Sequence, residues 1–326
     1  MYASRIRLAP LLIALAGVAA ARPAAAEWLY REAAIMGTRC DVELWADDRA
    51  RGEAAVEKVF AEMRRIDSAM STYKPDSEVS RVNMTAAAGP VQISRELYDL
   101  IASSIAYSTL TRGTFDITYA SVGYLYDYPK HIRPDEATIA AKLPGISYLH
   151  LHLDPQTTSV SYDRPGVRID FGGIGKGYAV DRMVDILKRN GITTALVAAS
   201  ASSIYGLGAP PSHPEGWAVD IRDPWQHSKT VAEVFLKNMS MSTSGSYEKF
   251  FRAEGRVWAH IMDPRTGYPA QGTVSVSVIT PRTIDSEAWA KPYFVNGRRW
   301  AEQHKPKDFR IYFCQDRTDQ PCAWLQ

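Results

Sequence analysis

The stretch Asp170-Phe171-Gly172-Gly173-Ile174-Gly175-Lys176-Gly177 joins two apolar segments of different periodicity. Val167–Phe171, which leads into it, is predicted to be a strand, and Gly177–Asn190, which follows, has the apolar spacing of a helix. Four glycines at such a junction let the backbone approach a ligand, and the helix start offers unpaired N–H groups to an anion. The stretch therefore predicts either a phosphate site or a tight strand-to-helix turn that needs glycine. Its spacing matches neither the Walker A nor the dinucleotide-binding pattern.

Strands and helices follow one another in unequal runs on both sides of this stretch. Before it, the apolar spacing predicts two strands, two helices and a hairpin, namely Glu27–Ala34, Cys40–Trp45, Ala54–Met70, Ser94–Thr111, and the pair Tyr148–Leu153 and Ser159–Tyr162. After it, the pattern predicts a helix over Thr283–Val295 and strands over Thr194–Ala198, Ser203–Leu207, Trp217–Ile221, Thr230–Leu236, Met239–Ser242, Arg256–Met262, Thr273–Ile279 and Phe309–Phe313. Because short turns join several strands, we expect an α+β fold whose antiparallel-rich sheets are flanked by helices.

The composition is that of a globular protein. The chain has 326 residues, of which 46% are hydrophobic and 23% are charged, and these figures exclude a mainly disordered chain. Its 38 basic and 36 acidic side chains leave a net charge of +2, which argues against nucleic acid as the main partner. No linker rich in Gly, Ser or Pro divides the sequence, so we expect residues 27–326 to form a single domain.

The amino terminus, residues 1–26, has the order of segments that is typical of a secretory signal peptide. Arg5 and Arg7 precede the apolar run Leu8–Ala21, and the small residues Ala24–Ala26 close the segment. The run is short for a membrane span, so a retained anchor or a buried helix is the weaker alternative. We expect an exported and soluble mature chain, periplasmic in a Gram-negative source and without a transmembrane segment. Since no cysteine lies near the cut, we expect no lipid anchor.

Three cysteines remain after processing. An oxidising compartment favours pairing, and the spacing of Cys314 and Cys322 across a turn-like segment suits a local disulfide, with Cys40 as a lone thiol. Three reduced, buried cysteines are the alternative. No group of cysteines and histidines has the spacing of a zinc site.

Three further polar segments are ambiguous when each is taken alone. Ser71–Asn83, expected to be a loop, offers an aromatic face, hydroxyls and carboxylates to a ligand, or simply a solvated surface. Gly113–Thr118 allows the same two interpretations. His260–Pro269 has turn chemistry, and His260 lies on the predicted strand Arg256–Met262, where a histidine is more often structural than catalytic.

In their amino-acid sequences and their order along the chain, these segments and Asp170–Asp181 resemble those of the FAD:protein FMN transferases of the ApbE type. The resemblance runs from Met36 to Gly297. It implies an exported ApbE-like α+β domain that binds FAD, uses Mg²⁺, and transfers the FMN moiety to a Thr or Ser hydroxyl of a target protein. A catalytically degenerate FAD-binding protein, or a pyrophosphatase that converts FAD to FMN and AMP, is the alternative.

The resemblance also implies roles for particular residues. Met36 and Tyr73 would contact the flavin, with Tyr73 supplying a stacking face. The other implied FAD-binding residues are Thr114, Phe115, Asp116, Asp170, Lys176, His260 and Ile261. The implied catalytic residues are His260, Lys176 and Asp116, with His260 near proton transfer. Such residues suit phosphoryl transfer, whose developing negative charge must be met by cations and fixed donors.

The implied magnesium site departs from the family pattern. Gly173 would present its backbone oxygen to the ion, but the helix that usually supplies an Asp and, four residues later, a Thr carries Glu287 and Lys291 here. Glu287 can still ligate Mg²⁺, and Asp285 is a further candidate ligand. Lys291 replaces the expected Thr ligand; a protonated lysine cannot ligate, repels a divalent ion and could occupy its place. An ordinary ion pair between Glu287 and Lys291 is the alternative.

A second departure lies at Ala198–Ile204, where the family commonly has Gly-Gly-Asp. The acidic group is missing, and Ser202 or Ser203 stands near its place. The sequence therefore predicts an intact FAD site beside an altered metal site, and transfer with or without a metal ion is compatible with it.

Overall fold

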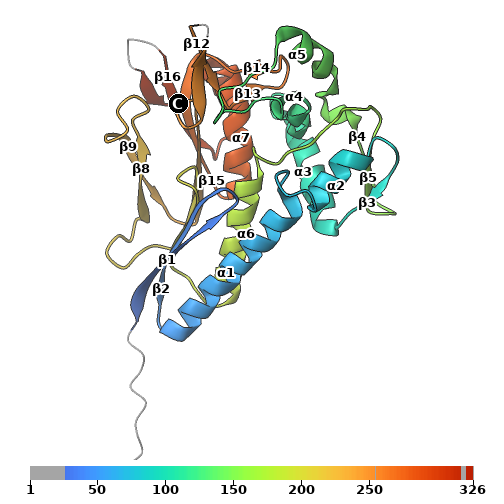
Figure 1. The fold of residues 1–326 in the computed structure, drawn as a ribbon. Helices are drawn as coiled ribbons and strands as arrows, with labels where there is room; N and C mark the ends of the chain where they lie inside the picture. Colours follow the sequence, from blue (N-terminus) through green and yellow to red (C-terminus); the bar gives the residue numbers. More distant parts are fainter. Residues whose placement is uncertain (1–25, 254, 317–320, 326) are drawn as a thin grey trace, which may run out of the picture.

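The computed structural model describes residues 26–253, 255–316 and 321–325 of the chain (Figure 1). The predicted signal peptide lies outside these residues except for Ala26. The helices are α1 (Arg49–Met70), α2 (Glu78–Thr85), α3 (Arg95–Leu110), α4 (Ala120–Gly123), α5 (Glu136–Lys142), α6 (Gly175–Arg189), α7 (Thr283–Asn296) and α8 (Arg298–His304). Within the described ranges, none of the helices has the length and hydropathy needed to span a membrane.

The strands are short and numerous. They are β1 (Glu27–Ile35), β2 (Thr38–Ala46), β3 (Val91–Gln92), β4 (Leu151–Asp154), β5 (Ser159–Tyr162), β6 (Ala195–Ala199), β7 (Ser203–Leu207), β8 (Trp217–Arg222), β9 (Thr230–Leu236), β10 (Met239–Gly245), β11 (Phe250–Ala253), β12 (Arg256–Ala259), β13 (Met262–Asp263), β14 (Tyr268–Pro269), β15 (Thr273–Thr280), β16 (Arg310–Gln315) and β17 (Cys322–Trp324). Eight of them form one sheet in the order β1-β2-β6-β7-β10-β15-β16-β17, and each neighbouring pair is antiparallel. The predicted α+β class with antiparallel-rich sheets is therefore confirmed.

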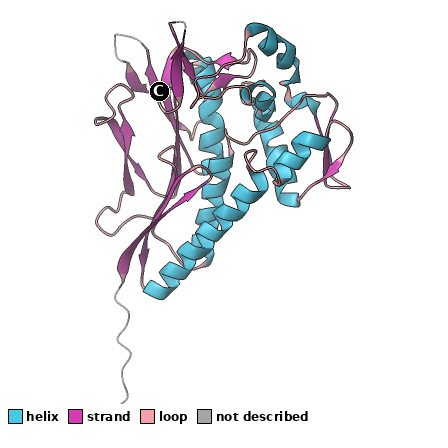
Figure 2. Cartoon of the chain, viewed as in Figure 1, coloured by secondary structure: helices cyan, strands magenta, loops and turns pink. Residues whose placement is uncertain are grey.

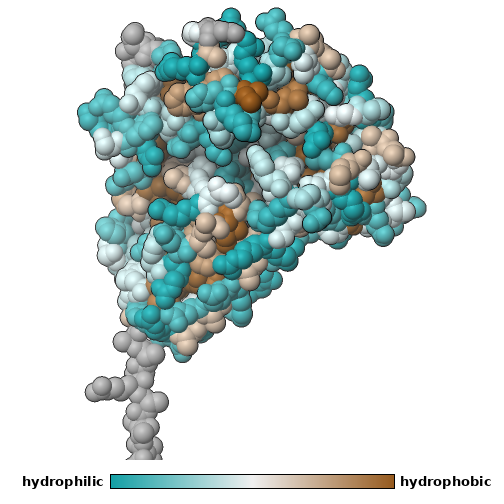
Figure 3. Space-filling model, in the orientation of Figure 1, coloured by the Kyte–Doolittle hydropathy of each residue, from teal (hydrophilic) through white to brown (hydrophobic). Residues whose placement is uncertain are grey.

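Helices cover one face of this sheet and a hairpin covers the other (Figures 1 and 2). On the helical side, α1, α6 and α7 lie against the strands. Strand positions alternate between buried and partly exposed, as in β2, where Val42 and Leu44 are fully buried. On the other side, Leu236 of the β8–β9 hairpin packs with Met241 and Tyr312 of the sheet. Figure 3 shows that hydrophilic residues predominate on the viewed surface, with apolar residues in small separate patches.

The predicted strand Val167–Phe171 is wrong. Most of the backbone bonds there go to side chains: Ile169 donates to Asn83 Oδ1 at 2.7 Å and accepts from Asn83 Nδ2 at 2.9 Å. Asp170 N donates to the backbone oxygen of Ile117, in a short 3-10 helix, at 3.0 Å. Arg168 donates to Ser121 Oγ at 3.0 Å. An apolar run can therefore read as a strand although side chains from distant segments satisfy its backbone.

Two further expectations need correction. The segment Ser71–Asn83 is not all loop, since α2 begins within it after the cap residue Ser77, whose Oγ accepts from Ser80 N at 3.0 Å. The predicted strand over Arg256–Met262 breaks at His260, which lies between β12 and β13 and donates its backbone N–H to Lys249 O at 3.0 Å. The break places His260 in a bend at the edge of a pocket.

The predicted disulfide is present and joins the last two strands of the sheet. Cys314 of β16 and Cys322 of β17 are directly opposite one another, with 4.1 Å between their Cα atoms. Residues 317–320 of the predicted turn between them lie outside the described residues. Cys40 is a buried thiol whose Sγ donates to Ile35 O at 3.6 Å, and burial raises its pKa to about 11.

Removing the disulfide is expected to lower stability. Cys322→Ala opens a loop with a sequence separation of 8, and a loop of this size contributes about 2–3 kcal/mol by the chain-entropy relation. We expect the free energy of unfolding, measured in urea, to fall by this amount. A reducing agent should lower the stability of the unaltered protein and leave that of the variant unchanged. Equal sensitivity of both proteins would show that the disulfide is not formed.

Candidate functional site

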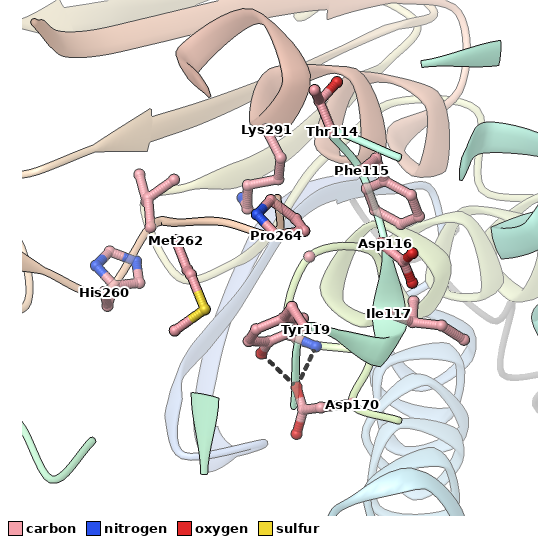
Figure 4. A pocket seen from close by; sticks show the side chains of 13 residues that line it. Thr114, Phe115, Asp116, Ile117, Tyr119, Asp170, His260, Met262, Pro264 and Lys291 are labelled. Carbon is pink, nitrogen blue, oxygen red and sulfur yellow. Dashed lines mark hydrogen bonds between the residues drawn. The ribbon is translucent and has the colours of Figure 1, made fainter. Parts of the chain in front are cut away.

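A partly open pocket lies where α7 and the glycine-rich turn before α6 meet the segments around residues 116 and 262 (Figure 4). The space between its walls, together with the solvent at its open mouth, amounts to about 520 Å³. Its lining residues are Thr114, Phe115, Asp116, Ile117, Tyr119, Asp170, Gly172, Gly173, His260, Ile261, Met262, Pro264 and Lys291. Three of the four polar segments singled out from the sequence thus line one cavity.

Asp170 joins the glycine-rich turn to two other segments. Its Oδ1 accepts from Tyr119 OH at 2.9 Å and from Gly172 N at 2.7 Å, and its Oδ2 accepts from Thr72 Oγ1 at 2.6 Å. Figure 4 shows the carboxylate at the pocket wall with Tyr119 beside it. The bond to Thr72 attaches the fourth polar segment, residues 71–83, to the pocket.

Asp116 is buried next to Ile117, whose carbonyl oxygen accepts from Asp170 N at 3.0 Å. Its Oδ1 accepts from Thr118 N at 2.8 Å and Thr118 Oγ1 at 2.6 Å, and its Oδ2 accepts from Tyr148 N at 2.7 Å. Burial raises the pKa of Asp116, and these donors oppose the shift. Since both oxygens face protein donors, the geometry gives Asp116 a positioning role, and its part in catalysis stays a prediction.

The glycine-rich turn starts α6 and also lets α6 approach α7 closely. Phe171 O accepts from Gly175 N at 2.7 Å, which begins the helix. A methyl group added at Gly177 would lie 2.4 Å from Thr283 O, so glycine is required here by helix packing. Gly173, by contrast, faces the pocket.

Asp181 of α6 caps α7, and the sequence did not single it out for this role. Its two carboxylate oxygens accept from Thr283 N at 2.7 Å and from Ile284 N at 3.0 Å. The residue at the start of α7, Arg282, makes no side-chain cap of its own. Since Asp181 is four residues beyond Gly177, it lies on the same helix face, and this spacing is the signal that could have indicated it.

Lys176 and Glu287 form an ion pair behind the pocket wall. Lys176 Nζ donates to Glu287 Oε1 at 2.9 Å, and the backbone N–H of Gly177 donates to Glu287 Oε2. Glu287 is only 2% exposed. Neither residue lines the pocket, so the structure does not bring Lys176 to the cavity as its implied FAD-binding and catalytic roles require.

The expected compensating ligand, Asp285, is also engaged elsewhere. Arg282 Nε and Nη2 donate to its two oxygens, each at 2.8 Å, and Tyr107 OH donates to Oδ1. It is absent from the pocket lining. The implied role of Asp285 in the metal site is therefore not supported by its position.

Lys291 enters the pocket from α7 (Figure 4). Its Nζ donates to Ser244 Oγ at 2.9 Å, so it does not form the alternative pair with Glu287 that the helical spacing allowed. Burial lowers the pKa of Lys291 to about 8; Lys176 acts in the same direction and Glu287 against it.

His260 lies at the pocket edge with a defined tautomer. Its Nδ1 is 3.3 Å from Lys249 O, and since a carbonyl only accepts, Nδ1 carries the hydrogen and Nε2 keeps its lone pair. Burial, followed by the charge of Lys291, lowers the pKa of His260 to about 3. The ring is therefore neutral at neutral pH and can accept a hydrogen bond through Nε2.

Met36 and Tyr73 lie outside the pocket lining. Met36 occupies the left-handed region at the β1–β2 turn, with φ of 56°, and its Cε would lie 3.9 Å from a methyl group at Gly175. Tyr73 follows Thr72, the residue bonded to Asp170, and its ring is 94% exposed. Its ring is therefore free to contact a ligand that extends out of the cavity.

The residues at the implied metal site do not fit Mg²⁺, which takes about six oxygen ligands in octahedral geometry. The carboxylates of Glu287 and Asp285 already accept from protein donors. Ser203, one of the two serines near the place of the missing acidic residue, is buried, and its Oγ makes no hydrogen bond within the described residues. In these residues, no three His, Cys, Asp or Glu side chains gather as a metal-binding group.

The chain as a whole is similar to known proteins. A family model described as the ApbE family matches residues 36–312. Two curated proteins of Klebsiella pneumoniae (strain 342), both named FAD:protein FMN transferase, are 29% and 30% identical to the chain. Their alignments cover 80% of this chain and 80% of the first protein, and 82% of this chain and 78% of the second. A protein of the same name from Escherichia coli (strain K12) is 28% identical, with 94% of this chain and 89% of that protein covered.

Solved structures show the same fold. The structure of an ApbE protein from Thermotoga maritima MSB8 has a TM-score of 0.81 and 26% identity, with 89% of this chain and 95% of that chain covered. The apo flavinyl transferase ApbE of Pseudomonas stutzeri has a TM-score of 0.79 and 25% identity, with 92% and 94% covered.

Proposed function

The chain belongs to the ApbE family, and we propose on this premise that it is an FAD:protein FMN transferase whose FAD site is the pocket between α7 and the start of α6. The observation that carries the assignment of the site is the meeting of polar segments from distant parts of the chain around one cavity. A binding protein without chemistry and a pyrophosphatase remain as outcomes of the test below.

The reaction makes one bond and breaks one. The oxygen of an acceptor Thr or Ser bonds to the phosphorus of the FMN moiety, and the bond from that phosphorus to the bridging oxygen of the pyrophosphate breaks. AMP leaves with the bridging oxygen, and the hydroxyl proton passes to a base. No electrons are transferred, so the protein has to position the acceptor and meet the developing charge.

Several residues of this chain suit these tasks. Thr114, Phe115 and Ile261 line the cavity and would hold FAD, while Met36 and Tyr73 would contact the flavin outside it. Asp116 and Asp170 hold the walls in place through their hydrogen bonds. His260, with its Nε2 lone pair, would accept a hydrogen bond from the acceptor hydroxyl and so lie at the proton transfer. Lys176 would act through Glu287 and Gly177, by fixing α6 against α7.

We assign no step to Mg²⁺, because the side chains implied as its ligands are engaged by other protein groups.

We also propose that the protein is exported. Residues 1–26 have the pattern of a signal peptide, and the Cys314–Cys322 disulfide suits an oxidising compartment. Cell fractionation with detection of the chain would test this location, and recovery in the cytoplasm with residues 1–26 retained would contradict it.

The test of the function is a transfer assay. Mature protein (residues 27–326) is mixed with FAD and an acceptor domain of the type that such transferases modify, and the intact mass of the acceptor is measured. An FMN adduct on a Thr or Ser supports the transferase. Release of FMN and AMP without an adduct would identify a pyrophosphatase, and FAD that binds but stays intact would identify a binding protein.

Replacing Tyr73 by alanine is expected to weaken flavin binding without affecting folding. The ring is 94% exposed, so the free energy of unfolding should change by less than about 0.5 kcal/mol. Loss of stacking against the flavin should reduce FAD affinity about 3- to 10-fold. Fluorescence titration with FAD measures the effect. Phe235→Ala, at an exposed ring of β9, is the matched control, and equal affinities for both variants would reject the stacking role.

A further inference from the structure

Lys291 provides the positive charge of the pocket. Among the described residues that line the cavity, it is the only Lys or Arg. Its side chain crosses Gly173: a methyl group at Gly173 would lie 3.6 Å from Lys291 Cγ and 3.8 Å from Cε. An ammonium group has three N–H donors, and Ser244 takes one of them at 2.9 Å. Two donors are therefore left for a ligand in the cavity.

The two acidic side chains of α7 that could ligate a divalent ion, Glu287 and Asp285, are both engaged by other protein groups. Glu287, one turn earlier on α7, is neutralised by Lys176 and by the N–H of Gly177. Asp285 is paired with Arg282 and accepts a hydrogen bond from Tyr107 OH. With both acidic groups engaged, the ammonium of Lys291 stands where a divalent ion would have to bind, and two cations repel each other at short range.

We propose that Lys291 takes the place of a divalent cation, so that this chain binds the pyrophosphate of FAD, and transfers FMN, without Mg²⁺. The inference rests on the proposed function, because it assumes that the pocket binds FAD. The ammonium of Lys291 can bind a phosphate oxygen directly through a charge-assisted hydrogen bond. Its hydrogen bond to Ser244 and the contact of its methylene groups with Gly173 fix the direction of the side chain. In this arrangement the helix that carries metal ligands in the family carries the cation itself.

A purely structural role is the competing explanation. Lys291 could serve only to donate to Ser244, in which case the bond would stabilise the contact of α7 with β10 and FAD would bind without it. The two explanations differ in their dependence on Mg²⁺ and on charge at position 291, and both can be measured apart from catalysis.

The experiment measures FAD affinity of the mature protein by fluorescence titration, in EDTA and in millimolar Mg²⁺. Calorimetric titration of the protein alone with Mg²⁺ accompanies it. We expect FAD affinity to differ by less than twofold between the two conditions and Mg²⁺ to show no binding. Lys291→Met, which keeps the volume and removes the charge, should weaken FAD binding in EDTA roughly 10- to 100-fold. Lys291→Arg should restore most of the affinity, and thermal melting confirms that both variants fold.

Other results would overturn the inference. FAD binding that needs Mg²⁺, or Mg²⁺ binding to the protein alone, would show that a metal site persists. Unchanged FAD affinity in a folded Lys291→Met variant would leave Lys291 with the structural role alone. Absence of FAD binding in every condition would overturn the proposed function, and this inference with it. Binding without Mg²⁺ but no FMN adduct on the acceptor would contradict the transfer part of both.

Discussion

Replacing Gly177 by alanine is expected to destabilise the protein by about 3 kcal/mol, although alanine is the better helix former by about 1 kcal/mol. The added methyl group would lie 2.4 Å from Thr283 O, 2.8 Å from Thr283 C and 3.0 Å from Ile284 Cα. These are backbone atoms at the start of α7, so no side-chain rotation relieves the clash. The two helices must move apart, which also breaks the bond from Gly177 N to Glu287.

The free energy of unfolding in urea measures this effect, and Gly173→Ala is its matched control. A methyl group at Gly173 meets Phe115 Cε2 at 3.4 Å and Lys291 Cγ at 3.6 Å, which are ordinary contact distances. We therefore expect Gly173→Ala to change stability by less than about 1 kcal/mol. If Gly177→Ala is as stable as the unaltered protein, the close packing of α6 on α7 is not present.

The glycine-rich stretch illustrates how far sequence reasoning reaches. It correctly predicted a helix after the turn, since the apolar spacing of α6 is strong and local. It could not separate the roles of the glycines, because Gly173 faces the pocket while Gly177 faces the backbone of a helix more than a hundred residues later. Packing between distant segments leaves no local pattern to read.

The same limit explains the failed predictions. Val167–Phe171 is apolar enough for a strand, but Asn83 and Ser121 satisfy its backbone. The pocket-lining residues within 113–118 and 260–269 were identified from the sequence only because these two segments resemble those of a known family. Tyr119, which also lines the cavity, lies just outside these segments and carries no chemical signature that would have set it apart.

The candidate metal residues show a third kind of limit. Glu287 and Lys291 are four residues apart on α7, and this spacing allowed either an altered metal site, with Lys291 in the place of a ligand, or an ion pair between the two. In the structure they face different partners, since Glu287 meets Lys176 and Lys291 meets Ser244. Spacing on a helix gives the face, but the partner depends on which strand or helix packs there.

Replacing Glu287 by glutamine is expected to cost about 3 kcal/mol, because the carboxylate serves two donors in a buried position. It is 2% exposed and accepts from Lys176 Nζ at 2.9 Å and from Gly177 N. Glutamine has one acceptor oxygen, so its NH₂ group would face one of these donors. Lys176, whose side chain is 24% exposed, can turn partly to solvent, and this keeps the loss at the lower end of the range for broken buried pairs.

Urea unfolding of the single and double variants tests this account. Lys176→Met removes the second donor, so in the double variant the glutamine oxygen can accept from Gly177 N and nothing opposes its NH₂ group. We therefore expect the double variant to be more stable than the sum of the two single effects predicts, by at least about 1 kcal/mol. Glu57→Gln, at an exposed position of α1, should change stability by less than about 0.5 kcal/mol. Strictly additive effects would show that Glu287 and Lys176 do not interact, and α6 would then be held against α7 by packing, including that at Gly177, and by the Asp181 cap.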